Sequence, residues 1–324
     1  MPVALITGIA GQDGHYLTHV LLDRGYEVVG ISRRATGIQA ASRLHLRDVD
    51  ITDRSALERV FADFHLDEVY NLAGQSFGPD SWKQPLETVA TLGVAVIHLL
   101  ELVRHSDHPI RFFQASSSEL FGEAVASPQS ESTPFRPRTP YGFAKQMAHA
   151  AVEAYRTRFG IFAACGILFN HESPLRRPEF VTRKVTREVA RIRAGLSARL
   201  RMGSLDVRRD WTFAGDIADA MWRVLQAGEP DDFVLASGTS HSVRELCETA
   251  FAHAGLDYRD YVEEESSLVR PGDFDRIGDP SKAARILGWT PSIPFRDFIG
   301  MMVDEDLRQL ERRNLEDPSN ADAR

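Results

Sequence analysis

Tyr141 and Lys145 stand four positions apart, a spacing that could form an acid–base pair. Residues i and i+4 share one face of a helix, and the segment TPYGFAK predicts a helix here. Thr139 suits the N-cap of that helix and Pro140 suits its first position. A lysine ammonium beside a phenol favours the phenolate and lowers its pKa. We therefore expect Tyr141 to act as a base near neutral pH.

The stretch QASSSELFG, residues 114–122, could supply a second reactive group. It follows IRFF, which is typical of a buried strand, so the serine run could be a strand end that opens on an active site. The carboxylate of Glu119 could act there as a base. The alternative is a surface glutamate at the start of a helix, where negative charge is favourable. The neighbouring Ser116 and Ser118 could simply cap backbone groups.

Gly8, Gly11 and Gly14 lie between an apolar run at 3–8 and a helical pattern. Glycine lets the backbone turn tightly and approach a pyrophosphate, whose charge is met by the helix N-terminus. The spacing is GxxGxxG rather than GxGxxG, and a glycine turn without a ligand is the alternative. We expect a dinucleotide here.

The end of the second apolar run, 27–32, indicates which dinucleotide is preferred. An acidic residue is expected there for NAD, but the chain has Arg33 and Arg34. Two guanidinium groups suit a 2′-phosphate, so the sequence favours NADP. The alternative is a solvated basic turn. Asp50 and Ile51 could border the adenine.

The elements that must position these residues alternate along the chain. Strands are predicted at 3–8, 27–32, 47–51, 68–74, 110–116, 162–169 and 232–238. Helices are predicted between them, among others at 55–64, 87–104 and 140–159. This alternation indicates right-handed βαβ units. We expect an α/β fold: a Rossmann-type doubly wound parallel sheet with a smaller α/β substrate-binding domain.

The regular alternation of predicted strands and helices ends after residue 169, and this change sets the expected domain boundaries. Residues 1–169 should form the NADP-binding Rossmann domain, to which the chain returns near 208–236. Residues 170–207 and 237–310 should bind the substrate, with RDWTF as a turn before a helix. Residues 311–324 form a polar tail that should fray. No linker separates the two halves, so they should share one cleft.

The composition excludes several classes of function. The 324 residues carry a formal net charge of −8, which argues against nucleic acid and anionic membrane as partners. Cys165 and Cys247 lack metal-ligand spacing, so we expect no metal and a reducing, cytoplasmic environment. The start MPVALITG has no signal-peptide pattern, and we expect that no apolar run reaches the length of a membrane span.

Together, TGIAGQDG, the serine-rich strand end and YxxxK resemble the extended short-chain dehydrogenase/reductases. More narrowly, the chain resembles the GDP-mannose 4,6-dehydratase family from about residue 3 to residue 307. This resemblance rests on QASSSELFG, TPYGFAK, GILFNHESPLRRPEFVTRKV, RRDWTFAGDIADAMW and RPGDFDRIGDPSKA. The block LFNHESP…FVTRK is its most specific part.

The resemblance implies a role for each matching residue. The catalytic positions are Ser117, Glu119, Tyr141 and Lys145. The cofactor positions are Gly8, Gly11, Gln12, Asp13, Asp50, Ile51, Leu72, Gln75, His171 and Arg176. The positions that bind the nucleotide diphosphate are Asn170, Lys184, Arg209 and Arg270. We add Ser76 and Asp273 to the substrate-binding residues.

Several positions depart from the family pattern. Ser117 replaces a threonine and keeps the hydroxyl, Thr88 replaces a tyrosine near the cofactor, Gly74 replaces an alanine, and Asp273 replaces a glutamate. The loop after Arg34 is short, which bears on the tetramer found in the family. No departure removes a catalytic group.

The implied reaction converts GDP-mannose to GDP-4-keto-6-deoxymannose and water. Tyr141 would deprotonate the C4 hydroxyl while a hydride passes from C4 to NADP⁺. Glu119 would then take the C5 proton as water leaves C6, and the hydride would return to C6. Alternatives are a dehydratase for another GDP-sugar such as a manno-heptose, a GDP-4-keto-6-deoxyhexose reductase or epimerase, and a silent NADP-binding protein.

We also expect a homodimer or homotetramer. The helix that carries Tyr141 has small residues that would permit close helix–helix approach, and the 87–104 helix could pair with it across a two-fold axis. These small residues are Ala144, Ala148, Ala151 and Ala154. The alternative is ordinary packing inside one subunit.

Overall fold

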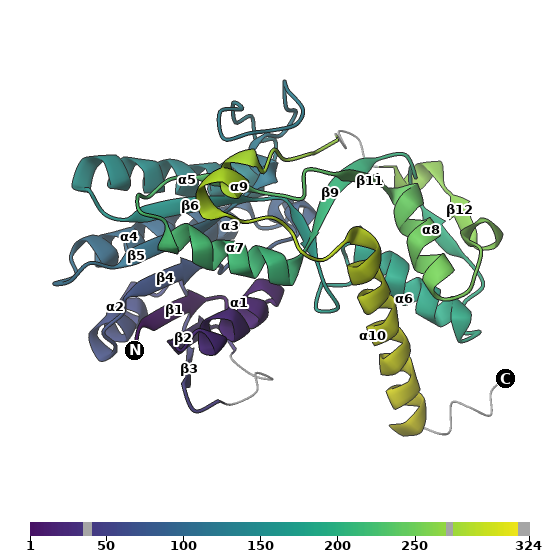
Figure 1. Cartoon of the computed structure of the whole chain (residues 1–324), viewed down its shortest axis with the longest axis horizontal. Helices are drawn as coiled ribbons and strands as arrows, with labels where there is room; N and C mark the ends of the chain where they lie inside the picture. The colour runs from purple at the N-terminus through teal and green to yellow at the C-terminus, as the bar shows by residue number, and fades with distance from the viewer. Residues whose placement is uncertain (35–40, 270–274, 317–324) are drawn as a thin grey trace.

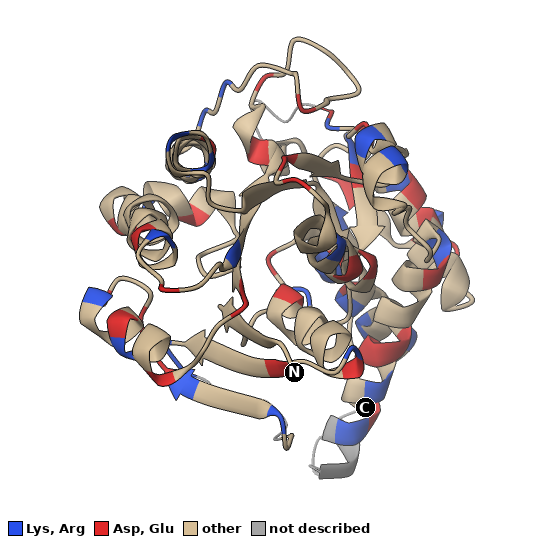
Figure 2. Ribbon diagram, turned by 60° about the vertical axis from the view of Figure 1, so that its left-hand side comes forward, with Lys and Arg blue, Asp and Glu red and all other residues tan. Residues whose placement is uncertain are grey.

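The structure is a computed structural model that describes residues 1–34, 41–269 and 275–316, with side chains as far as residue 312. A parallel sheet flanked by helices occupies one end of the molecule, and a smaller group of helices and short strands occupies the other (Figure 1). Acidic and basic residues are interspersed along the same helices rather than separated by sign (Figure 2).

The larger part is built on a seven-stranded sheet in the order β10-β6-β5-β4-β1-β2-β3. Its strands are β1 (Val3–Thr7), β2 (Glu27–Ser32), β3 (Leu44–Asp48), β4 (Glu68–Asn71), β5 (Arg111–Ser117), β6 (Ala163–Leu168) and β10 (Phe233–Leu235). All six neighbouring pairs are parallel. The runs are apolar because helices cover both faces. The expected Rossmann-type doubly wound sheet is confirmed.

The helices divide between the two faces of this sheet. One hydrophobic core lies under α1 (Gln12–Asp23) and α7 (Ala214–Gln226). The second core lies under α2 (Arg54–Asp63), α4 (Ala95–Arg104) and α5 (Pro140–Phe159). The short α9 (Ser281–Leu287) contacts β10 and α7.

Local signals fix the helix that carries Tyr141. Thr139 Oγ1 accepts a hydrogen bond from Gly142 N at 3.0 Å, and Pro140 occupies the first turn. Gly160 ends the helix in the left-handed region at φ +66°, which glycine adopts without a steric penalty. The predicted cap, first residue and stop of α5 are all confirmed.

The smaller part combines two short sheets with three long helices. The sheets are β11-β9-β7, made of Ser240–Ser242, Arg208–Phe213 and Asn170–Glu172, and β12-β8, made of Val262–Glu264 and Leu200–Met202. The helices are α6 (Val181–Arg193), α8 (Val243–His253) and α10 (Phe295–Glu316). Short 3-10 helices lie in the connecting segments of both parts: η1 (Gly78–Trp82) and η3 (Ser118–Leu120) in the larger part, and η4 (Tyr258–Asp260) and η5 (Ser266–Leu268) in the smaller part.

The segment RDWTF is a strand, so its prediction as a turn is wrong. It forms most of β9, which pairs with β7 on one side and β11 on the other. Its tryptophan, Trp211, is 1% exposed and joins the core between α6, α8 and α10. Because both partner strands lie far along the chain, the local pattern could not reveal this pairing.

The predicted 87–104 helix begins earlier and contains an irregular turn. It consists of α3 (Pro85–Val89), the π-helical turn η2 (Ala90–Val94) and α4. The whole run is long and apolar enough to span a membrane by length and composition, so the expectation that no run reaches this length is wrong. Part of its apolar surface is used inside the protein, since Val96, Leu99 and Leu100 are 0% exposed.

Candidate active site

The glycine turn between β1 and α1 lies at the carboxyl edge of the sheet, beside β4. Gly8 adopts φ +73°, and a Cβ there would lie 2.8 Å from Ala73 Cα. A Cβ on Gly14 would lie 2.5 Å from Ile9 Cα. Both positions therefore require glycine. The strand order reverses between β1 and β4, which is where this class of fold binds dinucleotides at a helix N-terminus.

Gln12, Asp13 and His171 lie together, although β7 and α1 are far apart in sequence. His171 Nε2 lies 3.0 Å from Asp13 Oδ1, and Gln12 Nε2 donates to His171 O at 3.1 Å. Burial raises the pKa of Asp13, but the charge of His171 and its hydrogen bond outweigh burial and hold that pKa well below its usual value. Burial lowers the pKa of His171, whereas Asp13 raises it, and the net shift is upward. The pair fixes the start of α1 against β7.

The residues expected around the adenosine lie at the ends of β2 and β3. Ser32 Oγ is buried and has no hydrogen-bond partner among the described residues. Arg33 is 75% exposed at its side chain, 3.8 Å from Glu87, and Arg34 is also exposed. Asp50 is exposed, and hydrogen bonds from Thr52 lower its pKa. An unsatisfied buried hydroxyl beside two exposed arginines fits a phosphorylated ribose.

The remaining cofactor candidates are less open. Ile51 is 5% exposed and packs in the core under α2 and α4, and Leu72 N donates to Thr7 Oγ1 at 3.1 Å. Gln75 Nε2 donates to Thr88 Oγ1 at 2.5 Å. Thr88, which stands where the family often has a tyrosine, is therefore buried and occupied with Gln75.

Ser117, Glu119 and Tyr141 meet where β5 ends. Ser117 Oγ accepts from Glu119 N at 3.2 Å, and the Ser117 hydroxyl is close enough to Tyr141 to lower the pKa of the phenol. The start of α5 packs against η3, because a Cβ on Gly142 would lie 3.1 Å from Glu119 O. The geometry thus brings a hydroxyl, a carboxylate and a phenol to one point, which a proton-transfer site needs.

The pKa of Tyr141 moves opposite to the sequence expectation. Burial raises it to about 12, and the nearby Glu119 adds to the rise, while Ser117 and Arg176 oppose it. The expected lowering by Lys145 is therefore wrong for the protein alone. The phenol is 8% exposed, and the penalty for burying a phenolate exceeds the favourable interactions.

Lys145 supports the site in another way. Its Nζ donates to Ala115 O at 2.7 Å and lies 5.8 Å from the centre of the Tyr141 ring. Burial lowers the pKa of Lys145 to about 8. The lysine thus connects α5 to β5 and places an amine with a lowered pKa near the phenol.

Three of the substrate-side candidates, Asn170, Arg209 and Lys184, lie on the smaller part. Asn170 pairs with Trp211 between β7 and β9. Arg209 lies on β9 and is 8% exposed. Lys184 is exposed on α6, with Nζ donating to Arg201 O at 2.6 Å. Ser76 is exposed after β4, whereas Arg270 and Asp273 lie outside the described residues.

Arg176 stands near Tyr141. Its Nε lies 3.1 Å from the buried Glu172, and its guanidinium lies 3.4 Å from the centre of the Phe180 ring. The guanidinium also lowers the pKa of Tyr141. Arg176, one of the residues expected to bind the cofactor, therefore also influences the phenol of Tyr141.

Sequence reasoning missed Arg276. Its guanidinium forms an ion pair with Glu119, with side chains 13% and 30% exposed. The residue lies within RPGDFDRIGDPSKA, which was noted for its resemblance, but 157 positions separate the two partners. No local signal connects them.

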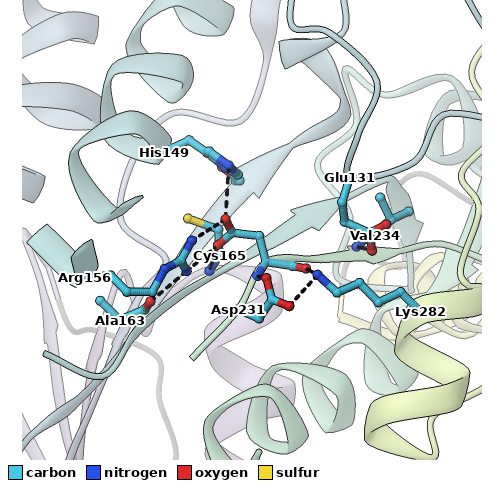
Figure 3. Close-up of polar contacts among 10 residues, drawn as sticks. Glu131, His149, Arg156, Ala163, Cys165, Asp231, Val234 and Lys282 are labelled. Carbon is cyan, nitrogen blue, oxygen red and sulfur yellow. Dashed lines mark hydrogen bonds and ion pairs between the residues drawn. The ribbon is translucent and has the colours of Figure 1, made fainter. Parts of the chain in front are cut away.

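Sequence reasoning also missed a buried polar network behind the catalytic strand. Ser116 Oγ lies 2.9 Å from His149 Nδ1, and His149 Nε2 lies 3.6 Å from Asp232. Arg156 donates to both carboxylate oxygens of Asp232, at 3.0 and 2.8 Å. Figure 3 shows His149, Arg156 and Cys165 converging on this point. His149 follows Tyr141 and Lys145 at four-residue intervals, so one face of α5 carries all three.

These ligand types could hold a metal by geometry, since His149, Cys165 and Asp232 bring ligand atoms within 4.8 Å of one another. However, the guanidinium of Arg156 already neutralises the carboxylate, and burial raises the pKa of the Cys165 thiol. The cluster is better described as a salt-bridge network than as a metal site.

A cavity of 540 Å³ lies away from these groups, lined by residues of β9, β11 and α8 and by the segment 291–296. Its wall includes Trp211, His241 and Phe295. None of the four candidate catalytic residues lines it.

Two of the small residues expected at a subunit contact are packed inside the chain. Ala144 and Ala148 are 1% and 0% exposed, so ordinary packing within one subunit explains them. Ala154 is exposed. Close approach of another helix to this face would therefore not use Ala144 or Ala148.

Comparison with known proteins shows to which family the chain is similar. Residues 5–302 match the family model described as GDP-mannose 4,6 dehydratase. GDP-mannose 4,6 dehydratase 2 of Arabidopsis thaliana is 44% identical, covering 97% of this chain and 89% of the plant protein. The human GDP-mannose 4,6 dehydratase is 39% identical, covering 96% and 93%.

Solved structures agree on the fold. A UDP-glucose 4-epimerase of Thermotoga maritima superposes with a TM-score of 0.85 at 22% identity, covering 95% of this chain and 99% of the epimerase. A dTDP-glucose 4,6-dehydratase of Bacillus anthracis, in complex with NAD, gives 0.84 at 21% identity, covering 96% and 94%. With the family model matching almost the whole chain and relatives near 40% identity, this protein belongs to the GDP-mannose 4,6-dehydratase family.

Proposed function

We propose that the protein converts GDP-mannose to GDP-4-keto-6-deoxymannose and water. Two observations carry the proposal: the backbone N of Glu119 donates to Ser117 Oγ at 3.2 Å, and, beyond the effect of burial, the charge of the Glu119 carboxylate raises the pKa of Tyr141. A reductase or epimerase that acts only at C4 uses the phenol but removes no proton from C5. A carboxylate next to the phenol is what an elimination requires.

Each residue has one task. Tyr141 takes the proton of the C4 hydroxyl, and Ser117 holds that oxygen by a hydrogen bond. Glu119 removes the C5 proton, which the C4 ketone has made acidic, and passes a proton to the C6 hydroxyl, which leaves as water. After the hydride has been added at C6, C5 regains a proton that has exchanged with solvent through Glu119. The glycine turn of Gly8, Gly11 and Gly14 would hold NADP⁺, which would supply the hydride acceptor and donor for C4 and C6 and a positive charge near the phenol that would lower the pKa of Tyr141. The reaction therefore consumes no external reductant.

The cofactor is NADP rather than NAD in this proposal. The support is Arg33 and Arg34, which are exposed and directly follow Ser32, whose buried hydroxyl has no hydrogen-bond partner within residues 1–34, 41–269 and 275–316. A hydrogen bond to a charged group contributes about 1.5–3 kcal/mol, so replacing both arginines with alanine should weaken NADP at least about tenfold more than NAD. A fluorescence titration in which both cofactors weaken equally would contradict the preference. Glu58→Gln, on exposed α2, is the control.

The rest of the site is assigned by the same reasoning. The turn residues Gly8, Gly11, Gln12, Asp13 and Gly14, with Asp50, Ile51, Leu72, Gln75, His171 and Arg176, bind the cofactor. The smaller part, 170–207 and 237–310 together with β9, binds the GDP-sugar through Asn170, Lys184, Arg209, Arg270 and Asp273, and Ser76 after β4 joins them. The cofactor-binding part is 1–169, and the chain returns to it within 208–236 through α7 and β10, which pack on the sheet, whereas β9 lies in the smaller part.

The decisive experiment supplies GDP-mannose and bound cofactor but no reductant. Mass spectrometry should detect a product that has lost one water. In deuterated water, C5 of the product should carry solvent deuterium, whereas C6 should carry the hydrogen that began at C4. A product without solvent deuterium at C5 would refute the elimination. Parallel reactions with GDP-manno-heptose and GDP-4-keto-6-deoxymannose distinguish the other substrates.

The protein also acts as a homo-oligomer in the cytoplasm. The support for association is an exposed apolar face beside α5, on which Trp82, Leu86 and Phe143 are 63%, 85% and 52% exposed. Exposed apolar patches of this kind mark interaction sites. Light scattering at micromolar concentration should give a dimer or tetramer, and a monomer mass would exclude association. Phe143→Ser should lower the mass, whereas Ile286→Ser, an exposed position on α9, should not.

A further inference from the structure

Arg276 contacts the proposed base directly and has no assigned role. Its guanidinium forms an ion pair with Glu119. The arginine comes from the segment 275–280, which lies in neither the glycine turn nor α5. This segment thus brings a third part of the chain to the reacting carboxylate.

The segment around Arg276 is firmly held. Asp210 N donates to Arg276 O at 3.0 Å, and Gln129 N donates to Ile277 O at 2.7 Å. Gln129 Oε1 accepts from Ile277 N at 3.0 Å, and Asp210 Oδ2 accepts from Gly278 N at 3.2 Å. Gln129 and Asp210 are each 1% exposed. The backbone therefore presents the guanidinium from a fixed place.

Close packing fixes the same segment on its other side. A Cβ on Gly278 would lie 2.4 Å from Ala236 Cβ and 2.9 Å from Val234 Cγ1. The segment thus rests directly on the end of β10. Any outward shift of Arg276 would have to break this contact and the four hydrogen bonds together.

Packing alone does not explain the arginine. Its Nε is buried and has no hydrogen-bond partner among the described residues. A buried donor without a partner is destabilising, so an apolar side chain would serve stability better. The ion pair with Glu119 is the contact that distinguishes arginine from such a side chain at this position.

We propose that Arg276 is a positioning residue for the elimination step, which holds the Glu119 carboxylate toward the C5 proton of the substrate. This inference rests on the proposed function. Arginine suits the task because its planar fork fixes the direction of a carboxylate, whereas a lysine ammonium fixes only its charge. Arg276 acts through Glu119, so it should influence proton removal from C5 and leave proton removal by Tyr141 unchanged.

The test separates these two steps. Arg276→Gln and Arg276→Lys are mixed with excess GDP-mannose in a stopped-flow fluorimeter, where reduced nicotinamide reports the first step. Solvent deuterium at C5, followed by mass spectrometry, reports the second. For Arg276→Gln we expect the first step within about twofold of wild type and the second slowed by roughly 10–100-fold, the range that follows from misplacing a reacting group. Arg276→Lys should recover part of the loss.

A double variant makes the test specific. If Arg276 acts only by holding the carboxylate, then Glu119→Gln with Arg276→Gln should be no slower than Glu119→Gln alone, because coupled residues are not additive. Arg285→Gln, exposed on α9 and not in contact with Glu119, is the matched control and should behave as wild type. Circular dichroism checks that each variant folds, and Arg276→Lys carries the test if Arg276→Gln does not.

Five outcomes overturn the inference. Equal slowing of both steps indicates a general structural role. A raised KM for GDP-mannose with both steps otherwise normal indicates that Arg276 binds the substrate instead. Additive losses in the double variant exclude action through Glu119. A wild type that releases no water from GDP-mannose overturns the proposed function as well, whereas an active wild type with a fully active Arg276→Gln overturns this inference alone.

Discussion

Replacing each of two adjacent aspartates, Asp232 and Asp231, tests how much the buried network behind the active site contributes to stability. Asp232 accepts from Arg156 at 3.0 and 2.8 Å and from Cys165 N at 2.9 Å, and its side chain is 15% exposed. Its neighbour Asp231 is 47% exposed and pairs with Lys282 at 2.6 Å. Figure 3 shows Asp231 and Lys282 on one side of the network and His149 and Arg156 on the other.

The structure sets the expected magnitude for Asp232→Asn. Breaking one side of a buried ion pair lowers the free energy of unfolding by about 3–5 kcal/mol. Asparagine keeps one oxygen as an acceptor, and Arg156 is 17% exposed, so water can reach part of the guanidinium. We therefore expect a loss of about 2–4 kcal/mol. Asp231→Asn weakens a pair in which Asp231 is 47% and Lys282 21% exposed, so solvent screens it and the loss should be less than about 1 kcal/mol.

Urea unfolding at neutral pH, followed by circular dichroism and intrinsic fluorescence, measures both losses. The two signals should give the same midpoint, and the slopes of the two variants should match that of wild type, so that midpoints report stability. If Asp232→Asn unfolds at the same urea concentration as Asp231→Asn, the network contributes no more than a surface pair, and its anchoring of α5 is refuted.

Three further predictions concern the reacting groups themselves. Glu119→Gln keeps its shape but cannot accept a proton, so elimination should slow by about 10²–10⁴-fold, and reduced nicotinamide should accumulate when GDP-mannose is added; normal turnover would contradict the assignment. Tyr141→Phe should abolish that fluorescence altogether, and a normal signal would exclude the phenol as the base. Burial lowers the pKa of Lys145 from 10.5 to about 8, so the unfolded chain binds more protons between these values and stability should rise with pH across them. Lys145→Met should remove this rise between about pH 8 and about pH 9.5, as measured by urea midpoints.

Several features of the protein could be predicted from the sequence because they depend on neighbours in the chain. The cap at Thr139 and the stop at Gly160 are local signals, and both end α5 as expected. The alternation of apolar runs and helical patterns predicts the parallel sheet, since helices that cover both faces leave the strands apolar throughout. The glycine turn at Gly8 is likewise required by backbone geometry and close approach.

Features that depend on distant partners could not be predicted in this way. RDWTF pairs within β9 only because β7 and β11 flank it in space, so its own five residues do not reveal a strand. Lys145 at the right spacing predicted a lowered pKa for Tyr141, but burial by the folded chain raises it instead. Desolvation depends on everything packed around a group, and spacing along a helix cannot measure it.

The contacts of the site divide in the same manner. The sequence determined that Glu119 follows a strand and that Tyr141, Lys145 and His149 share a helix face, since these relations span only a few residues. Only the tertiary structure decided that Arg276 meets Glu119 and that Asp232 meets Arg156, across 157 and 76 positions. Such contacts arise when segments that are distant in sequence meet at the end of the sheet. A single sequence lists these side chains but does not show which of them meet.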